Sequence, residues 1–190
     1  MKLVKLAFAG ALFLAASIGS AFAADDDYLT IQLKDGPVVI QLLPDVAPKH
    51  VKQIETLAKE GKYDNVAFHR VIEGFMAQTG DVEFGNMDHD FDAARVGTGG
   101  SKLPDLPAEF SDISFERGVV GMARAQDPNS ANSQFFIMFA DGPFLNGQYT
   151  VVGKVVSGME FVDKIKRGDG ANGEVTDPDR MIKVTVGKPQ

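Results

Sequence analysis

The chain has 190 residues, of which 44% are hydrophobic and 24% are charged, and its formal net charge is −7. This balance is typical of one globular domain and not of a disordered chain. The negative charge disfavours a general affinity for nucleic acid or anionic lipid. The sequence has no cysteine, so the fold needs no disulfide and a lipoprotein anchor is excluded.

Residues 1–23 have the three-part layout of a secretory signal peptide. A short basic start precedes an apolar run over residues 6–19, and Ala21–Ala23 matches an A-x-A cleavage site. An uncleaved membrane anchor is the alternative, but the run is short for a span of about 20 residues. We therefore expect cleavage after Ala23 and one mature domain over residues 24–190, without stable membrane insertion. The expected destination is the periplasm, with a eukaryotic secretory lumen as the alternative.

The first elements of the mature chain predict a hairpin followed by a helix. Residues 28–34 alternate between apolar and polar side chains, and residues 38–43 form a second apolar run. The Asp-Gly-Pro sequence between the runs is a turn signal, so the two strands should pair. In residues 44–61 the apolar positions recur at helical spacing, and Gly61 marks the helix end.

The stretch FHRVIEGFMAQTGD, residues 68–81, predicts two short strands joined by a turn at Glu73–Gly74. Period-two alternation places Phe68 and Ile72 on the same face as Arg70. Met76 and Gln78 share a face of the second strand, with Phe75 at its entry.

Arg70 and Gln78 are polar side chains within apolar strands. A solvated sheet face would be the ordinary explanation for both. Phe75 and Met76, however, gather on the same face, and buried polar groups need partners. The pattern therefore predicts an apolar pocket that contains one cation and one amide.

Residues 82–107 predict a solvated loop rich in Gly, Asp and Pro. Asp88, Asp90 and Asp92 resemble the start of a calcium loop, but Ala93 and Gly99 occupy positions that need Gly and Glu. The cluster GTGGS lacks the spacing of a phosphate-binding loop. We expect neither a metal nor a cofactor.

The second half of the chain contributes further short elements. Residues 134–139 alternate aromatic side chains onto both faces, with Phe135, Ile137 and Phe139 opposite Gln134, so both faces should be buried. The other predicted elements are strands at 118–125, 150–156 and 181–186, a loop at 141–149 and a helix at 158–167. The sequence thus contains many short strands, two helices and no βαβ units. This pattern predicts an all-β, mainly antiparallel domain, and a closed barrel is the architecture that we expect.

The segment YDNVAFHRVIEGFMAQT, residues 63–79, resembles the signature of the cyclophilins, the peptidyl-prolyl cis-trans isomerases of that fold. GVVGMARA at 118–125 and NSQFFIMF at 132–139 match two further segments of the family. The resemblance extends over residues 28–186. It implies a closed eight-stranded barrel capped by two α-helices, and isomerisation of X–Pro bonds without metal or cofactor.

The resemblance also assigns site residues. Arg70 would be catalytic, and Gln78 would bind the substrate backbone and orient Arg70. The backbone of Arg124 would hold the residue before proline. The full substrate-binding set implied by position is Phe75, Met76, Gln78, Ala123, Arg124, Gln134, Phe136, Phe144, Leu145 and Tyr149, of which Phe75, Met76, Phe136 and Leu145 would line the proline pocket.

Some positions depart from the family pattern. Phe144 stands where many members have Trp, a residue associated with tight cyclosporin binding, so weak cyclosporin binding is expected. Tyr149 stands where His is common, and Arg124 replaces a frequent Asn. The segment of residues 82–96 is longer than is usual in the family. The expected partners are proline-containing polypeptides, namely folding exported proteins, and the expected state is a monomer.

Three other functions compete with isomerisation. A hydrolase would need a nucleophile, but there is no G-x-S-x-G motif and no cysteine. Of the histidines, His50 belongs to the first helix and His89 to the acidic loop. His69 is near the pocket, but alternation turns it away from Arg70, which favours a structural histidine with satisfied hydrogen bonds. A non-catalytic binding module remains an alternative, which the intact set of Arg70, Phe75, Gln78 and Phe136 disfavours. A small-molecule carrier is another, but it would not explain an arginine and a glutamine so spaced in the barrel wall.

Overall fold

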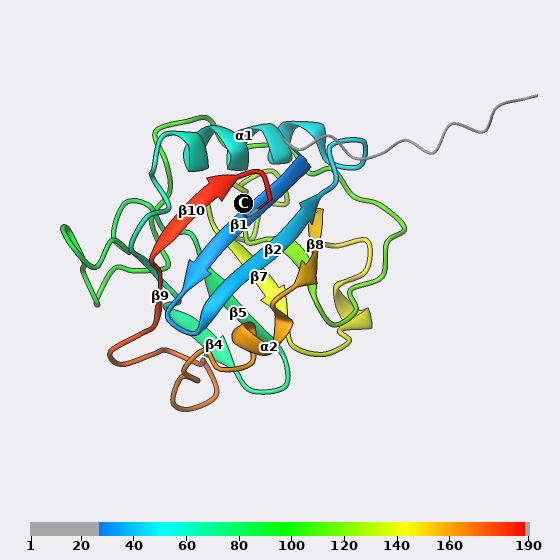
Figure 1. Ribbon diagram of the computed structural model, residues 1–190. Helices are drawn as coiled ribbons and strands as arrows, with labels where there is room; N and C mark the ends of the chain where they lie inside the picture. Colours follow the sequence, from blue (N-terminus) through cyan, green and yellow to red (C-terminus); the bar gives the residue numbers. More distant parts are fainter. Residues whose placement is uncertain (1–26, 189–190) are drawn as a thin grey trace, which may run out of the picture.

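The computed structural model describes residues 27–188, which form mainly antiparallel β-structure with two helices (Figure 1). The predicted signal peptide lies outside the described residues. Eight strands form one sheet, with bounds Tyr28–Leu33 for β1, Gly36–Leu42 for β2, Arg70–Ile72 for β4, Met76–Thr79 for β5, Val119–Met122 for β6, Phe135–Met138 for β7, Val151–Ser157 for β8 and Lys183–Val186 for β10. The sheet is curled, and its strand order is β10-β1-β2-β8-β6-β7-β5-β4.

The predicted N-terminal hairpin is confirmed. β1 and β2 pair antiparallel from Tyr28 opposite Gln41 to Leu33 opposite Gly36. β10 pairs with the other side of β1, with Leu29 opposite Val186. The hairpin therefore joins the C-terminal strand to the rest of the sheet.

The two helices lie at opposite ends of the curled sheet (Figure 1). α1, Pro48–Lys59, packs against β10, and α2, Met159–Val162, packs against β2. α2 is shorter than the predicted helix at 158–167, because the chain after Val162 continues in tight turns, with Ile165 N–H donating to the Val162 carbonyl at 3.1 Å. Within residues 27–188, none of the helices has the length and apolar character to cross a membrane.

The prediction of a closed barrel is wrong. β4 and β10 are the two edges of the eight-stranded sheet, and no ladder joins them. Two further strands, β3 (Val66–Ala67) and β9 (Arg180–Met181), form a separate two-stranded ladder, with Val66 opposite Met181. The sheet is therefore an open half-barrel.

The sheet stays open because a loop occupies the outer edge of β4. Val71 N–H donates to the Gly173 carbonyl at 2.7 Å, and the Val71 carbonyl accepts from Gly168 N–H at 2.9 Å. The His69 carbonyl also accepts from Val175 N–H at 3.1 Å. A Cβ at Gly173 would lie 2.4 Å from Ile72 Cγ1, so glycine permits this close approach. The backbone groups that could pair with β10 are thus already satisfied.

The sheet is buried on both faces around β5 and β7. Phe135, Ile137 and Phe139 belong to the main core inside the half-barrel, as predicted. Phe136 and Met138 belong to a second cluster on the outer face. The predicted alternation also places Met76 correctly, in the outer cluster. The prediction that Phe68 shares a face with Arg70 is wrong. Phe68 lies in the main core, because the break between β3 and β4 interrupts the strand.

Glu109 caps α1 from a distant loop. Ala47, at the start of the helix, provides no side-chain cap. The Glu109 carboxylate accepts from the backbone N–H of Lys49 at 3.1 Å and of His50 at 3.2 Å, and His50 Nδ1 lies 2.7 Å from Oε2. Partial burial alone would raise the pKa of Glu109, but the hydrogen bonds from His50 and Lys49 outweigh it and hold that pKa below its ordinary value. The carboxylate therefore stabilises both the helix terminus and the loop.

Replacing Glu109→Gln is expected to lower the free energy of unfolding by about 1–2 kcal/mol at neutral pH, because the charged acceptor at the helix terminus is lost. Since the folded-state pKa is depressed, this stabilisation is present above the unfolded pKa and disappears as the pH falls through the folded pKa. Urea unfolding of wild type and variant from neutral to acid pH measures the difference, which should shrink on acidification. Glu116→Gln removes an exposed pair with Lys154 at 3.7 Å and should change little. A Glu109 effect that stays constant into strong acid would contradict the assignment.

Candidate active site

A cleft of about 380 Å³ lies on the outer face of the half-barrel. Ten of the eleven predicted site residues line it, together with Gln148, which the sequence analysis missed. The ten are Arg70, Phe75, Met76, Gln78, Ala123, Arg124, Phe136, Phe144, Leu145 and Tyr149. Gln134 borders an adjoining hollow that shares Gln78, Ala123 and Arg124 with the cleft.

The floor of the cleft is apolar and closely packed. Met76, Phe136 and Leu145 are all at most 7% exposed. Phe115 stacks beneath Phe136 with ring centroids 5.8 Å apart, and a Cβ at Gly121 would lie 2.6 Å from both rings. The floor thus depends on a glycine behind it.

The rim of the cleft is formed by aromatic side chains that remain accessible. Phe144, in the short 3₁₀ turn at Pro143–Leu145, is 62% exposed and lies 5.5 Å from the Phe75 ring. Tyr149 meets Phe136 edge to face at 5.8 Å. An apolar ring of a ligand would therefore contact aromatic surfaces on several sides.

Arg70 is held at the edge of this apolar floor by contacts from two directions. Its Nη1 donates to Gln78 Oε1 at 3.3 Å and lies 3.9 Å from Met76 Sδ. Its Nε donates to the Asn172 carbonyl at 2.9 Å, in the loop that covers β4. Partial burial lowers the pKa of Arg70, but a guanidinium remains charged. The site therefore presents a fixed cation beside an apolar pocket.

A chain of amides connects Arg70 to the loop that follows residue 81. Gln78 Nε2 donates to Gln134 Oε1 at 3.0 Å. Gln134 Nε2 in turn donates to the carbonyls of Gly97 at 3.0 Å and Gly99 at 2.8 Å. Gln134 therefore lies behind the cleft and fixes the orientation of Gln78.

The buried Asp81 carboxylate holds the base of that loop. Its Oδ1 accepts from the N–H groups of Glu83 and Phe84, at 3.1 and 2.9 Å. Its Oδ2 accepts from those of Gly97 and Gly99, at 2.7 and 3.0 Å. The ends of the extended segment 82–96 are thus fixed beside the cleft.

Arg124 uses its side chain within the protein. The guanidinium donates to the carbonyls of Gln148 at 3.0 Å and Ala125 at 2.9 Å, and lies 4.5 Å from the centre of the Tyr149 ring. Within residues 27–188, no hydrogen bond to another residue occupies its backbone N–H or carbonyl. The backbone of Arg124, and not its charge, is available to a ligand. Gln148 could not be found from the sequence because it enters the lining through a Gly-rich loop without periodicity.

His69 differs from the satisfied histidine predicted by alternation. The ring is 6% exposed, and neither nitrogen has a hydrogen-bond partner among the described residues. The Ala67 carbonyl and the Gln134 amide lie nearby, but without the geometry of a hydrogen bond. Burial lowers the pKa of His69 to about 4, against the opposing effect of Asp81. The ring is neutral at physiological pH.

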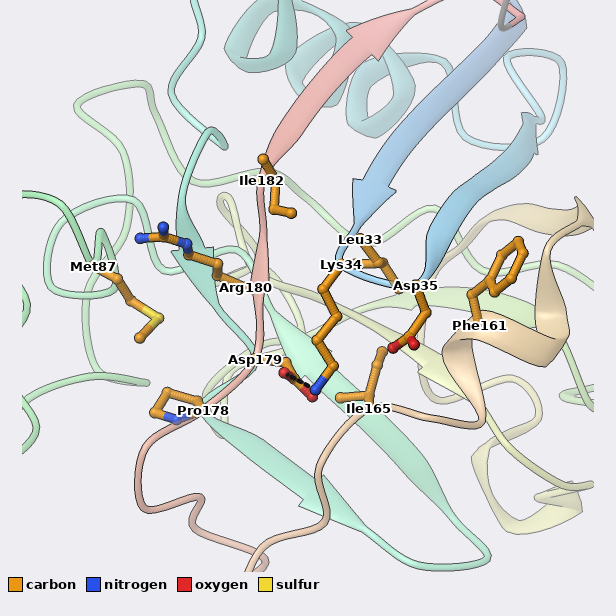
Figure 2. A pocket seen from close by; sticks show the side chains of 10 residues that line it. All are labelled: Leu33, Lys34, Asp35, Met87, Phe161, Ile165, Pro178, Asp179, Arg180 and Ile182. Atoms are coloured by element: carbon orange, nitrogen blue, oxygen red, sulfur yellow. Dashed lines mark hydrogen bonds and ion pairs between the residues drawn. The ribbon is translucent and has the colours of Figure 1, made fainter.

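Another pocket, shown in Figure 2, lies between the β1–β2 turn, α2 and residues 178–182. An ion pair of 2.6 Å between Lys34 and Asp179 crosses it. None of the predicted site residues lines this pocket, and it shares no residue with the cleft. In residues 27–188, no cluster of three or more His, Asp or Glu side chains could hold a metal ion.

The cleft favours binding and electrostatic chemistry over covalent catalysis. The described residues that line it provide two guanidinium groups, two amides and aromatic surfaces, but no serine, thiol or carboxylate. Such a site suits a reaction in which charge or a lone pair develops without bond cleavage.

Comparison with known proteins identifies the family. Residues 28–186 match the family model described as cyclophilin type peptidyl-prolyl cis-trans isomerase/CLD. A probable peptidyl-prolyl cis-trans isomerase of Brucella suis is 66% identical over 191 residues, covering 98% of this chain and 97% of that protein. A peptidyl-prolyl cis-trans isomerase of Helicobacter pylori is 39% identical over 145 residues, covering 75% of this chain and 82% of that protein.

Solved structures agree with this result. The cyclophilin AquaCyp293 of Hirschia baltica superposes with a TM-score of 0.72 at 26% identity, covering 86% of this chain and 75% of that one. A cyclophilin type isomerase of Cryptosporidium parvum, solved in the presence of the dipeptide Ala-Pro, gives a TM-score of 0.72 at 26% identity and covers 85% of this chain and 99% of that one.

The open half-barrel, with Arg70 at the edge of its cleft, is thus the scaffold of an isomerase. The chain belongs to the cyclophilin-type peptidyl-prolyl cis-trans isomerases, as the resemblance implied, and it is an enzyme of that activity.

Gly121→Ala is expected to disturb the cleft from behind, because the new Cβ would crowd the Phe115 and Phe136 rings at 2.6 Å. Overpacking of this kind costs about 1–3 kcal/mol. Urea unfolding measures the loss of stability, and NMR of the Phe136 ring reports its displacement. Unchanged stability together with unchanged ring resonances would show that the floor does not need the glycine.

Proposed function

We propose that Arg70 catalyses prolyl isomerisation by stabilising the twisted amide over the apolar cleft. Rotation about an X–Pro bond crosses a barrier of about 18–20 kcal/mol, because it breaks amide resonance. When the amide twists, the prolyl nitrogen regains a lone pair and accepts hydrogen bonds. A guanidinium beside that nitrogen interacts with the twisted state and not with either planar form, which is the requirement for catalysis.

The fixed position of Arg70 is the observation that supports this mechanism. Gln78 and the Asn172 carbonyl hold the guanidinium from two sides, so little reorganisation accompanies the reaction. The pocket of Phe75, Met76, Phe136 and Leu145 would hold the proline ring and exclude water from the contact. Gln78 and the Arg124 backbone would bind the substrate backbone. Phe144 and Tyr149 would close the pocket, beside Ala123 and in front of Gln134.

Arg70→Ala is expected to lower kcat/KM about 10- to 150-fold, because a hydrogen bond from a charged donor contributes about 1.5–3 kcal/mol. Arg70→Lys should recover only part of the activity, since an ammonium lacks the planar fork that Gln78 holds. NMR exchange on a short Ala-Pro peptide measures the rates, with circular dichroism as a check of folding. Arg124→Ala is the matched control: it removes the other arginine side chain of the cleft and should have a much smaller effect.

The outcomes of this experiment separate the activity from its mechanism. An active wild type with an equally active Arg70→Ala variant would refute the role of Arg70. An inactive wild type that still binds the peptide would leave a cyclophilin-like binding module, the alternative raised by the sequence.

We also propose that the enzyme is exported and assists the folding of exported proteins in the periplasm. The signal-like layout of residues 1–23 supports this proposal. A monomeric state and weak cyclosporin binding are proposed with it, the latter because Phe144 stands in place of a tryptophan.

Expression of the full chain in a Gram-negative host tests the export proposal. Mass spectrometry of the periplasmic fraction should find a protein that begins at Ala24. Replacing Ala21 and Ala23 by bulky residues should block cleavage and leave the protein at the membrane. A full-length protein found only in the cytoplasm would refute export.

A further inference from the structure

The loop at 168–175 lies along the outer edge of β4, the strand that begins at Arg70 (Figure 1). Three backbone hydrogen bonds fasten the loop there, two of them to Val71 and one to the His69 carbonyl. Arg70 itself lies opposite Glu174 in an antiparallel bridge. The loop therefore follows the β4 backbone on both sides of Arg70.

The guanidinium of Arg70 is held by two neutral oxygen atoms. Its Nε donates to the Asn172 carbonyl at 2.9 Å, and its Nη1 donates to Gln78 Oε1 at 3.3 Å. The carbonyl contact lies within the ordinary range of N–H···O hydrogen bonds, which the amide contact slightly exceeds. The backbone of the loop is therefore the firmer of the two supports.

Contacts on two different nitrogens fix the plane of the guanidinium. Nε and Nη1 of Arg70 are engaged, whereas its Nη2 has no hydrogen-bond partner among residues 27–188. Because both acceptors are uncharged, neither of them neutralises the cation. If the Asn172 carbonyl moved away, only the longer contact with Gln78 would remain, and the plane would no longer be fixed.

Gly173 determines how closely the loop can approach β4. Its φ is +70°, and a Cβ there would lie 2.4 Å from Ile72 Cγ1 and 2.9 Å from the Val71 carbonyl oxygen. Both atoms belong to β4, so a side chain at this position must push the loop away from the strand. The Asn172 carbonyl directly precedes Gly173 in the chain and would move with it.

Gly170 provides a comparison within the same loop. Its φ of +68° is nearly the same as that of Gly173. Among the described residues, however, a Cβ at Gly170 would have no atom beyond its chain neighbours within 4 Å. Alanine would therefore bring the same backbone strain to both positions, but only at Gly173 would it also press against β4.

We propose that Gly173 is a positioning residue for prolyl isomerisation. By letting the loop lie against β4, it keeps the Asn172 carbonyl on Arg70 Nε and so fixes the guanidinium at the cleft. Gly173 does not line the cleft, so it acts through Arg70. The inference rests on the proposed function, in which Arg70 stabilises the twisted amide, because such stabilisation depends on preorganised geometry.

The test measures kcat/KM on an Ala-Pro peptide by NMR exchange for Gly173→Ala, Arg70→Ala and the double variant Arg70→Ala/Gly173→Ala. Gly173→Ala should lose about three- to tenfold, the effect of one hydrogen bond. Its affinity for the peptide, measured by NMR titration, should change by less than about twofold, because the apolar floor of the cleft is untouched. In the double variant, Gly173→Ala should cause no further loss, since Arg70 is already absent.

The matched control is Gly170→Ala, which should stay within about twofold of wild type because its Cβ displaces nothing. Circular dichroism checks that each variant is folded. Equal losses in Gly170→Ala and Gly173→Ala would overturn the proposal, since backbone strain and not displacement from β4 would then be the cause. A folded Gly173→Ala as active as wild type would also overturn it, as would an equal further loss in the Arg70→Ala background.

A measurement on the wild type decides the matter if Gly173→Ala does not fold. The Hε proton of Arg70 should exchange with solvent more slowly than that of Arg95, whose Nε has no hydrogen bond within residues 27–188. Equally fast exchange would overturn the proposal, because the Asn172 carbonyl would then not hold Arg70. A fully active Arg70→Ala variant would instead refute the proposed role of Arg70, and an inactive wild type would refute the proposed function itself.

Discussion

The geometry of the site depends on one buried carboxylate. Asp81 lies just after β5. Its carboxylate accepts hydrogen bonds from four backbone N–H groups and so fixes Gly97 and Gly99. The carbonyls of these glycines hold Gln134, Gln134 holds Gln78, and Gln78 holds Arg70. The position of the guanidinium is therefore set by a chain of directional contacts, each of which leaves few alternatives for the next.

The strands that build the core also build the cleft. Because successive side chains of β5 and β7 point to opposite faces, Ala77 and Ile137 pack inside the half-barrel while Met76 and Phe136 form the outer floor. A site on paired strands is held more rigidly than one on loops, which suits a reaction that depends on preorganised contacts. The loops then contribute Phe144 and Tyr149 at the rim and the Gly97 and Gly99 carbonyls that hold Gln134.

Strand alternation predicted the part of the site around Arg70 and Gln78, which are polar side chains within apolar strands. The other residues of the cleft, such as Phe136 and Tyr149, were assigned by the resemblance to the cyclophilins and not by any period. The β3–β9 ladder was missed because a two-residue strand has no period, and its pairing depends on contacts distant in sequence. The break between β3 and β4 also made the placement of Phe68 wrong. The prediction of a closed barrel was also wrong. Closure depends on which backbone groups bond to the edge of β4, and the alternation of side chains does not show this.

The covered edge of β4 affects how an enzyme that acts on proline-containing polypeptides can meet its substrate. An open row of N–H and carbonyl groups beside the cleft would invite an extended client to add itself as a further strand. The loop at 168–175 occupies those groups, and Gly173 lets it approach closely enough to do so. A polypeptide at the cleft therefore meets the side chains that line it and not an open strand edge. With these groups satisfied, the edge of β4 presents no free row of backbone groups to which an extended polypeptide could add a strand.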